Sequence, residues 1–387
     1  MEPWREKYLV FGSPYLGAEE RAEVLACFDS RWLGTGPRVA RLEEQFRAYL
    51  DVPAAVAVSS GTAALHLALL ELRLPPGSDV LVPAMTFAAT ANAVIHAGHR
   101  PVFVDCDRGT LNVTALELER RLTPGTRAIV PVHFAGRPCE MEEIGAFARR
   151  HDLRVVEDCA HAIEAQVGGR HCGTFGDFGC FSLYVTKNVT SAEGGIVVAR
   201  TVEQAARIQV MALHGMSKDA WRRFSDQGYV HYEVVAPGFK YNLTDLAASI
   251  GIHQLARVEQ LYLRRRALWD RYQRELAGLP LHLPAAPAPG TRHALHLFTC
   301  LVDDTRTAVT RDQVRAGLHR LRVGAGVHYR ALHLMPYYRE AFGTKEGDCP
   351  NAEWVGARTF SIPFSAAVDD EDAGDVILAL RAVLGAG

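Results

Sequence analysis

The chain has 387 residues, of which 48% are hydrophobic and 22% are charged. This length predicts two or three domains, or one large α/β core with an appendage, and the composition excludes a disordered chain, a collagen-like repeat and a coiled coil. Forty-two lysines and arginines against 44 aspartates and glutamates give a net charge of -2. This balance offers no global positive field for nucleic acid or an anionic membrane.

No segment predicts export or membrane insertion. The opening sequence MEPWREKYLVFG alternates charged and bulky residues and lacks the apolar core of a secretory signal. No apolar run approaches the roughly 18 residues that span a bilayer. We therefore expect a soluble cytoplasmic protein that binds neither a membrane nor nucleic acid.

The cysteines and histidines show no metal-site spacing. The eight cysteines include no CxxC pair, and the 16 histidines include no HxxxH or HExxH pair. This pattern is typical of neither a disulfide scaffold nor a zinc site. We expect buried, unpaired cysteines and no metal.

From about residue 17 to residue 200, short apolar runs alternate with amphipathic stretches, which is typical of crossover units on a largely parallel sheet. The expected strands are Ala54–Val58, Asp79–Pro83, Arg100–Asp105, Arg127–Val132, Leu153–Glu157, Cys180–Val185 and Gly195–Ala199. The expected helices lie near Gly61–Glu71, Phe87–Ala97, Leu116–Leu122 and Met141–His151. Several strands are apolar at successive positions, so helices should cover both faces of a layered α/β/α domain.

The chain changes character after Gly215. The segment Met216–Pro237 lacks periodicity, which favours a functional loop, whereas Thr244–Ala277 predicts one long helix. The Pro- and Ala-rich segment Leu283–Gly290 is typical of a linker. The elements expected beyond it are a strand at Ala294–Val302, a helix at Thr310–Leu321 and a strand at Val323–Tyr329. We place a large domain at residues 1–245, and the long helix with a small α+β domain at 246–387; residues before about 15 should pack on the small domain.

Three motifs lie where predicted strands end. Ser59–Leu65 opens a predicted helix. The free N–H groups and the positive dipole end of a helix N-terminus can bind an anion. The alternative interpretation of this motif is an ordinary Ser/Thr helix cap. Leu153–Asp158 ends in acids that could pair with a cationic ring nitrogen, bind a metal or cap a helix. Phe181–Lys187 ends in a lysine that is either solvated or made nucleophilic by partial burial. A phosphate cradle, a strand-end acid and a strand-end lysine are together the parts that hold pyridoxal phosphate, PLP.

The same motifs resemble those of a known family. In chain order they are Ser60-Gly61-Thr62, Glu157-Asp158-Cys159-Ala160-His161, Phe181-Ser182 with Thr186-Lys187, Glu193-Gly194-Gly195 and Lys240-Tyr241-Asn242. Their order and spacing are similar to those of the DegT/DnrJ/EryC/StrS sugar aminotransferases, which are fold-type I PLP enzymes. The resemblance runs from about Gly12 to the C-terminus. It implies a three-layer α/β/α large domain with a smaller α+β C-terminal domain.

The resemblance also implies roles for individual residues. Lys187 would be the Schiff-base lysine, which also moves the substrate proton, and Asp158 would pair with the pyridine nitrogen. L-Glutamate would donate the amino group and leave pyridoxamine phosphate, and a nucleotide-linked keto sugar would accept it. The residues assigned to cofactor binding are Ser60, Gly61, Thr62, Phe87, Asp158, His161, Ser182, Lys187 and Asn242.

Within this set, the phosphate ligands would be Gly61, Thr62 and Ser182, with Asn242 reaching the phosphate from the second subunit of a homodimer. The ring of Phe87, in Pro83-Ala84-Met85-Thr86-Phe87, would stack on the cofactor. His161 stands where a glutamine is common, facing the ring hydroxyl, and an imidazole could serve the same hydrogen-bonding role.

Within the family, the sequence most resembles the branch that aminates C4 of a nucleotide-linked 4-keto sugar, and this resemblance implies the substrate. The features that carry it are Asn188, the Ala192-Glu193-Gly194-Gly195 turn, His214-Gly215-Met216, Asp219-Ala220-Trp221 and Ala236–Asn242. This branch makes UDP-4-amino-4-deoxy-L-arabinose or dTDP-4-amino-4,6-dideoxyglucose. The Ala- and Arg-rich composition favours an antibiotic-sugar pathway, and therefore dTDP-4-keto-6-deoxyglucose as the substrate.

Five residues are expected to contact the substrate. Trp32 and Thr35 match a family loop at the mouth of the site, and His328, Tyr329 and His333 match a segment that approaches the sugar nucleotide. Aromatic rings could stack on the base, and cationic groups could meet the diphosphate. A packed strand end is the alternative for His328 and Tyr329.

Other functions remain open at this point. A 3-keto-sugar aminotransferase would use the same residues, whereas PLP-dependent sugar 3-dehydratases typically have histidine in place of Lys187. A non-catalytic binding or regulatory protein would not need the lysine, the aspartate and the phosphate cradle together. A nicotinamide-dependent reductase would need a GxGxxG motif after an early strand, and none is present.

Overall fold

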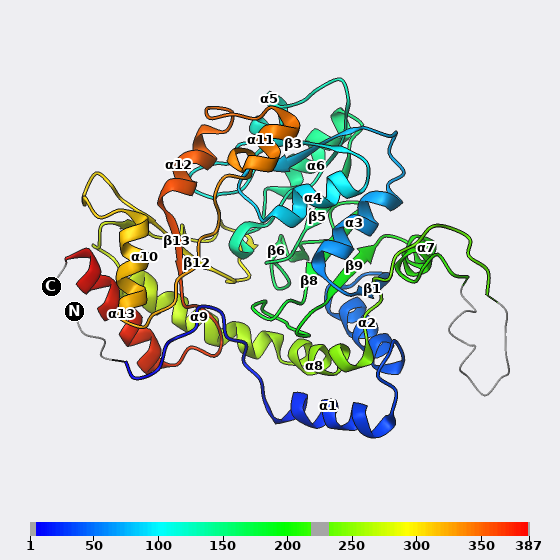
Figure 1. Ribbon diagram of the computed structural model, residues 1–387, viewed down its shortest axis with the longest axis horizontal. Helices are drawn as coiled ribbons and strands as arrows, with labels where there is room; N and C mark the ends of the chain where they lie inside the picture. Colours follow the sequence, from blue (N-terminus) through cyan, green and yellow to red (C-terminus); the bar gives the residue numbers. More distant parts are fainter. Residues whose placement is uncertain (1–4, 218–231, 386–387) are drawn as a thin grey trace.

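A seven-stranded sheet forms the centre of the larger part of the molecule (Figure 1). The computed structural model describes residues 5–217 and 232–385. The strand order is β1-β9-β8-β5-β4-β2-β3, and every pair from β8 to β3 is parallel, whereas β9 runs antiparallel to both of its neighbours. The strands are β1 (Ala54–Val58), β2 (Asp79–Pro83), β3 (Arg100–Val104), β4 (Thr126–Ile129), β5 (Arg154–Asp158), β8 (Phe178–Ser182) and β9 (Gly195–Ala199).

Helices cover both faces of this sheet. Successive strand residues point to opposite faces, so Val56 and Val58 join one apolar core while Ala55 and Ala57 join another. The helices on the first face are α3 (Gly61–Glu71), α4 (Ala88–His96) and α7 (Val202–Ala212). Those on the second face are α2 (Pro37–Leu50), α5 (Ala115–Arg120), α6 (Met141–Arg150) and α8 (Asp245–Ala256). The result is the expected α/β/α layering.

A separate apolar core lies in the C-terminal part of the chain. It is built by α9 (Val258–Glu275), α10 (Arg311–Arg320), α13 (Asp370–Leu384), β12 (Phe298–Val302) and β13 (Thr359–Ile362). The chain near the N-terminus packs here, because Arg5 forms ion pairs with Asp372 and Asp375 on α13. Leu9 also forms an isolated β-bridge with Val323. The chain then continues to α1 (Ala18–Ser30).

Shorter elements complete the fold. They are β6 (Gln166–Val167), β7 (Arg170–His171), β10 (Leu281–His282), β11 (Thr291–Arg292), α11 (Pro336–Phe342), α12 (Pro350–Arg358) and the 3₁₀ turns η1 (Phe134–Gly136) and η3 (Leu332–Leu334). The N-terminus of α12 is tied to the large sheet by Asp105, which follows β3 and accepts the N–H groups of Asn351 and Ala352.

The structure corrects the C-terminal elements. The single helix expected at Thr244–Ala277 is two helices, α8 and α9, because the backbone leaves helical geometry at Arg257. The strand expected at Val323–Tyr329 does not form; this segment makes only isolated bridges from Val323 and Gly326. The strand expected from Ala294 begins at Phe298. Each error arose where apolar residues continue past the point at which the backbone changes direction.

The structure also bears on the expected state of the cysteines and on the expected absence of a membrane span. All eight cysteines are unpaired and buried, as expected for small apolar residues in cores. Among residues 5–217 and 232–385, no helix is long and apolar enough to cross a membrane. Most of Met216–Pro237, including the Asp219-Ala220-Trp221 motif, lies outside the described residues.

Candidate active site

Three of the sequence motifs meet at one edge of the large sheet. β1 and β8 both run antiparallel to β9, so their carboxyl ends lie at the same edge, and β5 lies parallel to β8 with Asp158 paired to Cys180. A Cβ atom added to Gly61, after β1, would lie 2.8 Å from Cβ of Ser182, at the end of β8. The phosphate-cradle, acid and lysine motifs therefore share one site.

The start of α3 has the geometry of an anion site. Ser60 caps the helix, since its hydroxyl accepts the N–H of Ala63 at 3.1 Å. The cap leaves other N–H groups of the first turn unpaired within the helix, and the positive end of the helix dipole favours an anion there. Thr62 is exposed beside them, and Ser182 borders Gly61. The cap interpretation and the anion-site interpretation of this motif are therefore compatible.

Lys187 is held in a loop just after β8. Its backbone N–H donates to the carbonyl of Tyr184 at 2.9 Å. Burial lowers the pKa of its amine from 10.5 to about 8, although the nearby Asp158 carboxylate acts in the opposite direction. A large fraction of the amine is thus neutral, and therefore nucleophilic, at mildly alkaline pH.

Asp158 ends β5 as a buried carboxylate with two donors. Thr90 on α4 donates its hydroxyl hydrogen to Oδ2 at 2.8 Å, and the N–H of Ala160 donates to Oδ1 at 3.1 Å. Burial raises the pKa of Asp158, while these donors and the Lys187 charge oppose the shift. A cationic ring nitrogen facing this carboxylate would gain a charge-assisted hydrogen bond.

His161 lies three residues beyond Asp158 with a fixed tautomer. The backbone N–H of Ala135 donates to its Nδ1 at 3.2 Å, so the ring proton sits on Nε2, which lies 3.3 Å from the Tyr329 hydroxyl. Burial and the Lys187 charge lower the pKa of His161 well below 6.5. The ring is therefore a neutral N–H donor, as the amide of a glutamine would be.

Phe87 is the N-cap residue of α4 and is 61% exposed. Its only close aromatic neighbour in the described part of the chain is Tyr329, with the ring centroids 6.1 Å apart. Tyr329 also lies 6.0 Å from Phe134 and 6.3 Å from His161 between centroids. The largely uncovered face of Phe87 is suited to stacking on a flat ligand.

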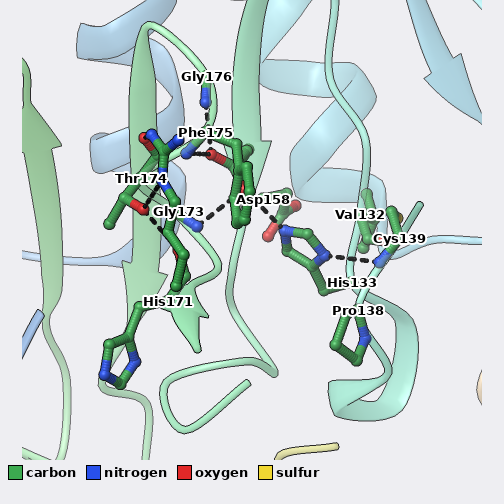
Figure 2. Close-up of polar contacts among 12 residues, drawn as sticks. Val132, His133, Pro138, Cys139, Asp158, His171, Gly173, Thr174, Phe175 and Gly176 are labelled. Carbon is green, nitrogen blue, oxygen red and sulfur yellow. Dashed lines mark hydrogen bonds and ion pairs between the residues drawn. The ribbon is translucent and has the colours of Figure 1, made fainter. Parts of the chain in front are cut away.

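Glu157, the other acid of the motif, has a structural role. Its carboxylate accepts the N–H groups of Gly173, Phe175 and Gly176 and the Nε2–H of His133. Figure 2 shows His133 on one side of β5 and the turn that carries Gly173–Gly176 on the other. A fully buried carboxylate with four donors fixes this turn against the strand.

The same cluster does not suit a metal. Ligand atoms of His133, Glu157 and Cys159 lie within 4.8 Å of one another. However, Nδ1 of His133 accepts the N–H of Cys139 at 3.0 Å, so Nε2 carries the proton that Glu157 accepts. Neither ring nitrogen then has a lone pair free for a metal ion.

The remaining predicted residues divide into two groups. Trp32, Thr35 and Asn242 lie together, because Nε1 of Trp32 donates to the Thr35 carbonyl at 3.0 Å and Nδ2 of Asn242 donates to the Thr35 hydroxyl at 2.7 Å. Asn242 also forms a bridge with Val58, which places it beside the end of β1 within its own chain.

His328 lies close to Lys187, whereas His333 is held elsewhere. The Lys187 charge and, above all, burial lower the pKa of His328 to about 4, and its Nδ1 lies 2.9 Å from the Ser361 hydroxyl. The side chain of His333 is fully buried, and its Nε2 lies 2.9 Å from Glu353 on α12. The structure thus brings His328 to the lysine and Tyr329 to His161 and Phe87, whereas His333 lies elsewhere.

Sequence reasoning missed Thr90. Its contact with Asp158 crosses from α4 to β5, and no local pattern marks it. The one available indication is the four-residue spacing of Thr86, just before α4, and Thr90 in its first turn, whose hydroxyls meet at 2.9 Å.

Comparison with known proteins gives concordant findings. The model of the DegT/DnrJ/EryC1/StrS aminotransferase family matches residues 14–381. The spore coat polysaccharide biosynthesis protein SpsC of Bacillus subtilis is 42% identical over 381 residues, which are 98% of each chain.

Two solved structures extend this comparison. The PMP form of a putative sugar aminotransferase from Streptococcus pneumoniae, Spr1654, superposes with a TM-score of 0.91 at 30% identity, covering 97% of this chain and 99% of that one. A PLP form of the same protein is also known. The structure of DesI in the presence of its TDP-sugar product superposes with a TM-score of 0.87 at 30% identity, covering 100% of this chain and 95% of that one.

Proposed function

Because the chain belongs to the DegT/DnrJ/EryC1/StrS aminotransferase family, we propose that it transfers the amino group of L-glutamate to C4 of a nucleotide-linked 4-keto sugar. Family membership and the structural relatives make it a PLP-dependent sugar aminotransferase. The observation that carries the proposal is the convergence of a lysine with a lowered pKa, a buried carboxylate and a helix N-terminus at one sheet edge.

The residues at this edge fit PLP. The close approach of Gly61 to Ser182 leaves no room for a side chain at position 61, so backbone N–H groups remain accessible to a phosphate. Asp158 offers a buried anion for a pyridinium, and the exposed ring of Phe87 offers a stacking surface. His161 offers an N–H donor for a ring oxygen. These are the contacts that the phosphate, ring nitrogen, ring face and ring hydroxyl of PLP each require.

Bound PLP supplies an aldehyde that reacts with amines and a pyridinium ring that withdraws electrons. Lys187 holds the cofactor through its Nζ atom and, once free, accepts and returns the proton that leaves the donor carbon. A pKa of about 8 suits both functions, because the amine can exist in either protonation state near neutral pH. Asp158 keeps the ring nitrogen protonated, with Thr90 and Ala160 holding the carboxylate in place.

For the substrate, we propose dTDP-4-keto-6-deoxyglucose, which would give dTDP-4-amino-4,6-dideoxyglucose. The C4-branch motifs in this sequence support it, and the TDP-sugar product of the similar protein DesI is consistent with a thymidine nucleotide. We place Trp32, Thr35, His328 and Tyr329 on the substrate side of the site. An antibiotic-sugar pathway remains part of this proposal, and the alternatives are the UDP-pentose and the 3-keto sugars.

We further propose a homodimer in which Asn242 reaches the phosphate of the partner's site. Large apolar side chains are exposed on and after α1 and around the site, which supports burial by a second copy. They are Leu25, Phe28, Trp32, Leu33, Phe87 and Tyr184. The eight free cysteines fit a reducing compartment, and we propose the cytoplasm.

The half-reaction with the amino donor tests the proposal. The protein loaded with PLP should lose its visible absorbance when L-glutamate is added, and D-glutamate should leave the absorbance unchanged. Adding a dTDP-linked 4-keto-6-deoxy sugar should restore the visible band, whereas restoration only by a UDP-linked 4-keto pentose or by a 3-keto sugar would move the substrate to those alternatives. A PLP-loaded protein that does not respond to L-glutamate or other amino acids would refute the proposal.

A further inference from the structure

A second histidine, His296, lies against His161. The rings of His161 and His296 are 4.4 Å apart between centroids and are tilted by 34°. His296 belongs to the segment before β12 and is only 4% exposed. No motif in the sequence analysis included it.

The tautomer of His296 is fixed by Asn188, the residue that follows Lys187. Both N–H bonds of the Asn188 amide are used, since Nδ2 donates to Oε2 of Glu164 and to the carbonyl of Ala294, each at 2.8 Å. A flipped amide would place its oxygen against two other oxygens. Oδ1 of Asn188 therefore accepts from Nδ1 of His296 at 3.0 Å, and Nδ1 carries the proton.

A buried ion pair holds Asn188 in this orientation. Glu164 is fully buried and pairs with Arg265 of α9, whose Nε donates to the carbonyl of Leu295 at 3.1 Å. The pair fixes both the carboxylate that Asn188 contacts and the backbone next to His296. Because each member has a partner, the network has one favoured arrangement.

Burial and the surrounding charges keep both imidazole rings neutral. Burial is the main cause that lowers the pKa of His161 and of His296 well below 6.5, and the Lys187 amine and the His328 ring act in the same direction. Arg265 and His293 add to the effect at His296. An imidazolium at either position would face these groups without a carboxylate contact.

We propose that His296, held by Asn188 with its proton on Nδ1, is a positioning residue: it holds the ring of His161, whose tautomer is fixed by Ala135, in the orientation that presents its Nε2–H to the bound cofactor. This inference rests on the proposed function. It gives the Glu164–Arg265 pair and Asn188 a role in the site although none of them is assigned a cofactor contact. Among the described residues that face His161, Lys187 is then the group that titrates near neutral pH.

Two substitutions separate the ring contact from the hydrogen bond. His296→Asn keeps a donor for Asn188 but removes the stacked ring, and His296→Phe keeps a flat ring but removes the donor. His293→Asn is the matched control, because His293 is equally buried in the same segment but lies against Trp269. A purely structural role would give similar effects at both positions.

The test combines spectra of the bound cofactor with kinetics. His296→Asn should shift the pH titration of the visible cofactor band and lower kcat about tenfold, with KM for L-glutamate changed less than about twofold, since orientation and not binding is lost. His296→Phe should cause a smaller change, and His293→Asn should leave the titration as in the wild type. An unchanged titration in His296→Asn, or an equal shift in His293→Asn, would overturn the proposal.

A measurement on the wild-type holoenzyme decides the matter if the variants do not fold. Nitrogen-15 NMR of histidine-labelled protein should show His296 protonated on Nδ1 and His161 on Nε2, with neither titrating between about pH 6 and about pH 8. A proton on Nε2 of His296, or titration of either ring in that range, would overturn it. Failure of the chain to form any visible PLP band would instead count against the proposed function and leave the tautomer result to judge this inference.

Discussion

Thr90 donates its hydroxyl hydrogen to Oδ2 of Asp158 at 2.8 Å, which ties the first turn of α4 to the end of β5. The contact matters because Asp158 is buried, and burial raises its pKa. Each hydrogen bond to the ionised form opposes that shift and favours the carboxylate over the neutral acid. Thr90 is thus part of what allows Asp158 to serve as an anion opposite a ring nitrogen.

Replacing Thr90 by valine should make the ionised form of Asp158 less stable without changing the shape of the site. The loss of one hydrogen bond to a charged group costs about 1.5–3 kcal/mol, so we expect about a 10- to 100-fold fall in kcat/KM or in affinity for PLP. Thr90→Ser keeps the hydroxyl and should retain most of the activity. Cofactor dissociation followed by absorbance, together with steady-state kinetics, measures both; wild-type values for Thr90→Val would remove Thr90 from the account.

Lys187→Met should stabilise the cofactor-free protein at neutral pH. The folded pKa of Lys187, about 8, lies below the ordinary lysine value of 10.5, so between these values the unfolded chain binds one more proton. Stability from this group therefore rises with pH across that window, and the full penalty applies below about pH 8. Removing the amine should gain on the order of 2–4 kcal/mol at pH 7 and less towards pH 10.

Urea unfolding of the cofactor-free wild type and of Lys187→Met, at several pH values, measures this difference. The difference between the two proteins cancels the titration of other groups in the same range. A variant that is no more stable at pH 7, or a difference that does not shrink as the pH rises, would show that Lys187 is not desolvated.

Glu157→Gln should destabilise the fold strongly, although glutamine has nearly the same size and shape as glutamate. The new amide nitrogen would face backbone N–H groups of the turn at Gly173–Gly176, or the Nε2–H of His133, and leave a buried donor unpaired. We expect a loss of about 2–4 kcal/mol in the free energy of unfolding. The exposed Glu193→Gln is the control and should change stability little. Equal stabilities for the two variants would contradict the structural role of Glu157.

Asn242→Ala should weaken retention of PLP if Asn242 reaches the partner's phosphate. In the single chain its Nδ2 donates to the hydroxyl of Thr35, so the variant also removes a local contact. Thr35→Val removes that local contact while keeping Asn242, and it should retain PLP better than Asn242→Ala does. Dialysis followed by absorbance gives the retained fraction; equal retention by Asn242→Ala and the wild type would exclude the phosphate role.

The strands of the large sheet could be located from the sequence because each contains or adjoins a short apolar run between longer amphipathic stretches. β1, β2 and β9 have the expected bounds, and α3 begins at the expected Gly61. The break between α8 and α9 could not be predicted, since Arg257 is an ordinary helix former and apolar residues continue on both sides. The segment Val323–Tyr329 has the composition of a strand, but it has partners only at isolated positions.

The site residues also differ in whether a local sequence pattern marks them. Gly61 begins a helix, Asp158 ends a strand and Lys187 lies in the loop after a strand, and the local patterns around these residues place them at the carboxyl edge of a sheet. Thr90 and His296 act through contacts between distant segments, which leave no local pattern. His333 shows the opposite error: it lies five residues after His328, yet the chain turns it into a buried pair with Glu353.

Transfer of an amino group to C4 of a nucleotide-linked sugar can be followed by a product assay. The enzyme would receive PLP, nitrogen-15-labelled L-glutamate and a panel of dTDP- and UDP-linked 4-keto and 3-keto sugars, with products identified by mass spectrometry and NMR. We predict labelled nitrogen at C4 of a dTDP-4,6-dideoxyhexose. Label at C3, or no labelled sugar from any member of the panel, would contradict the account.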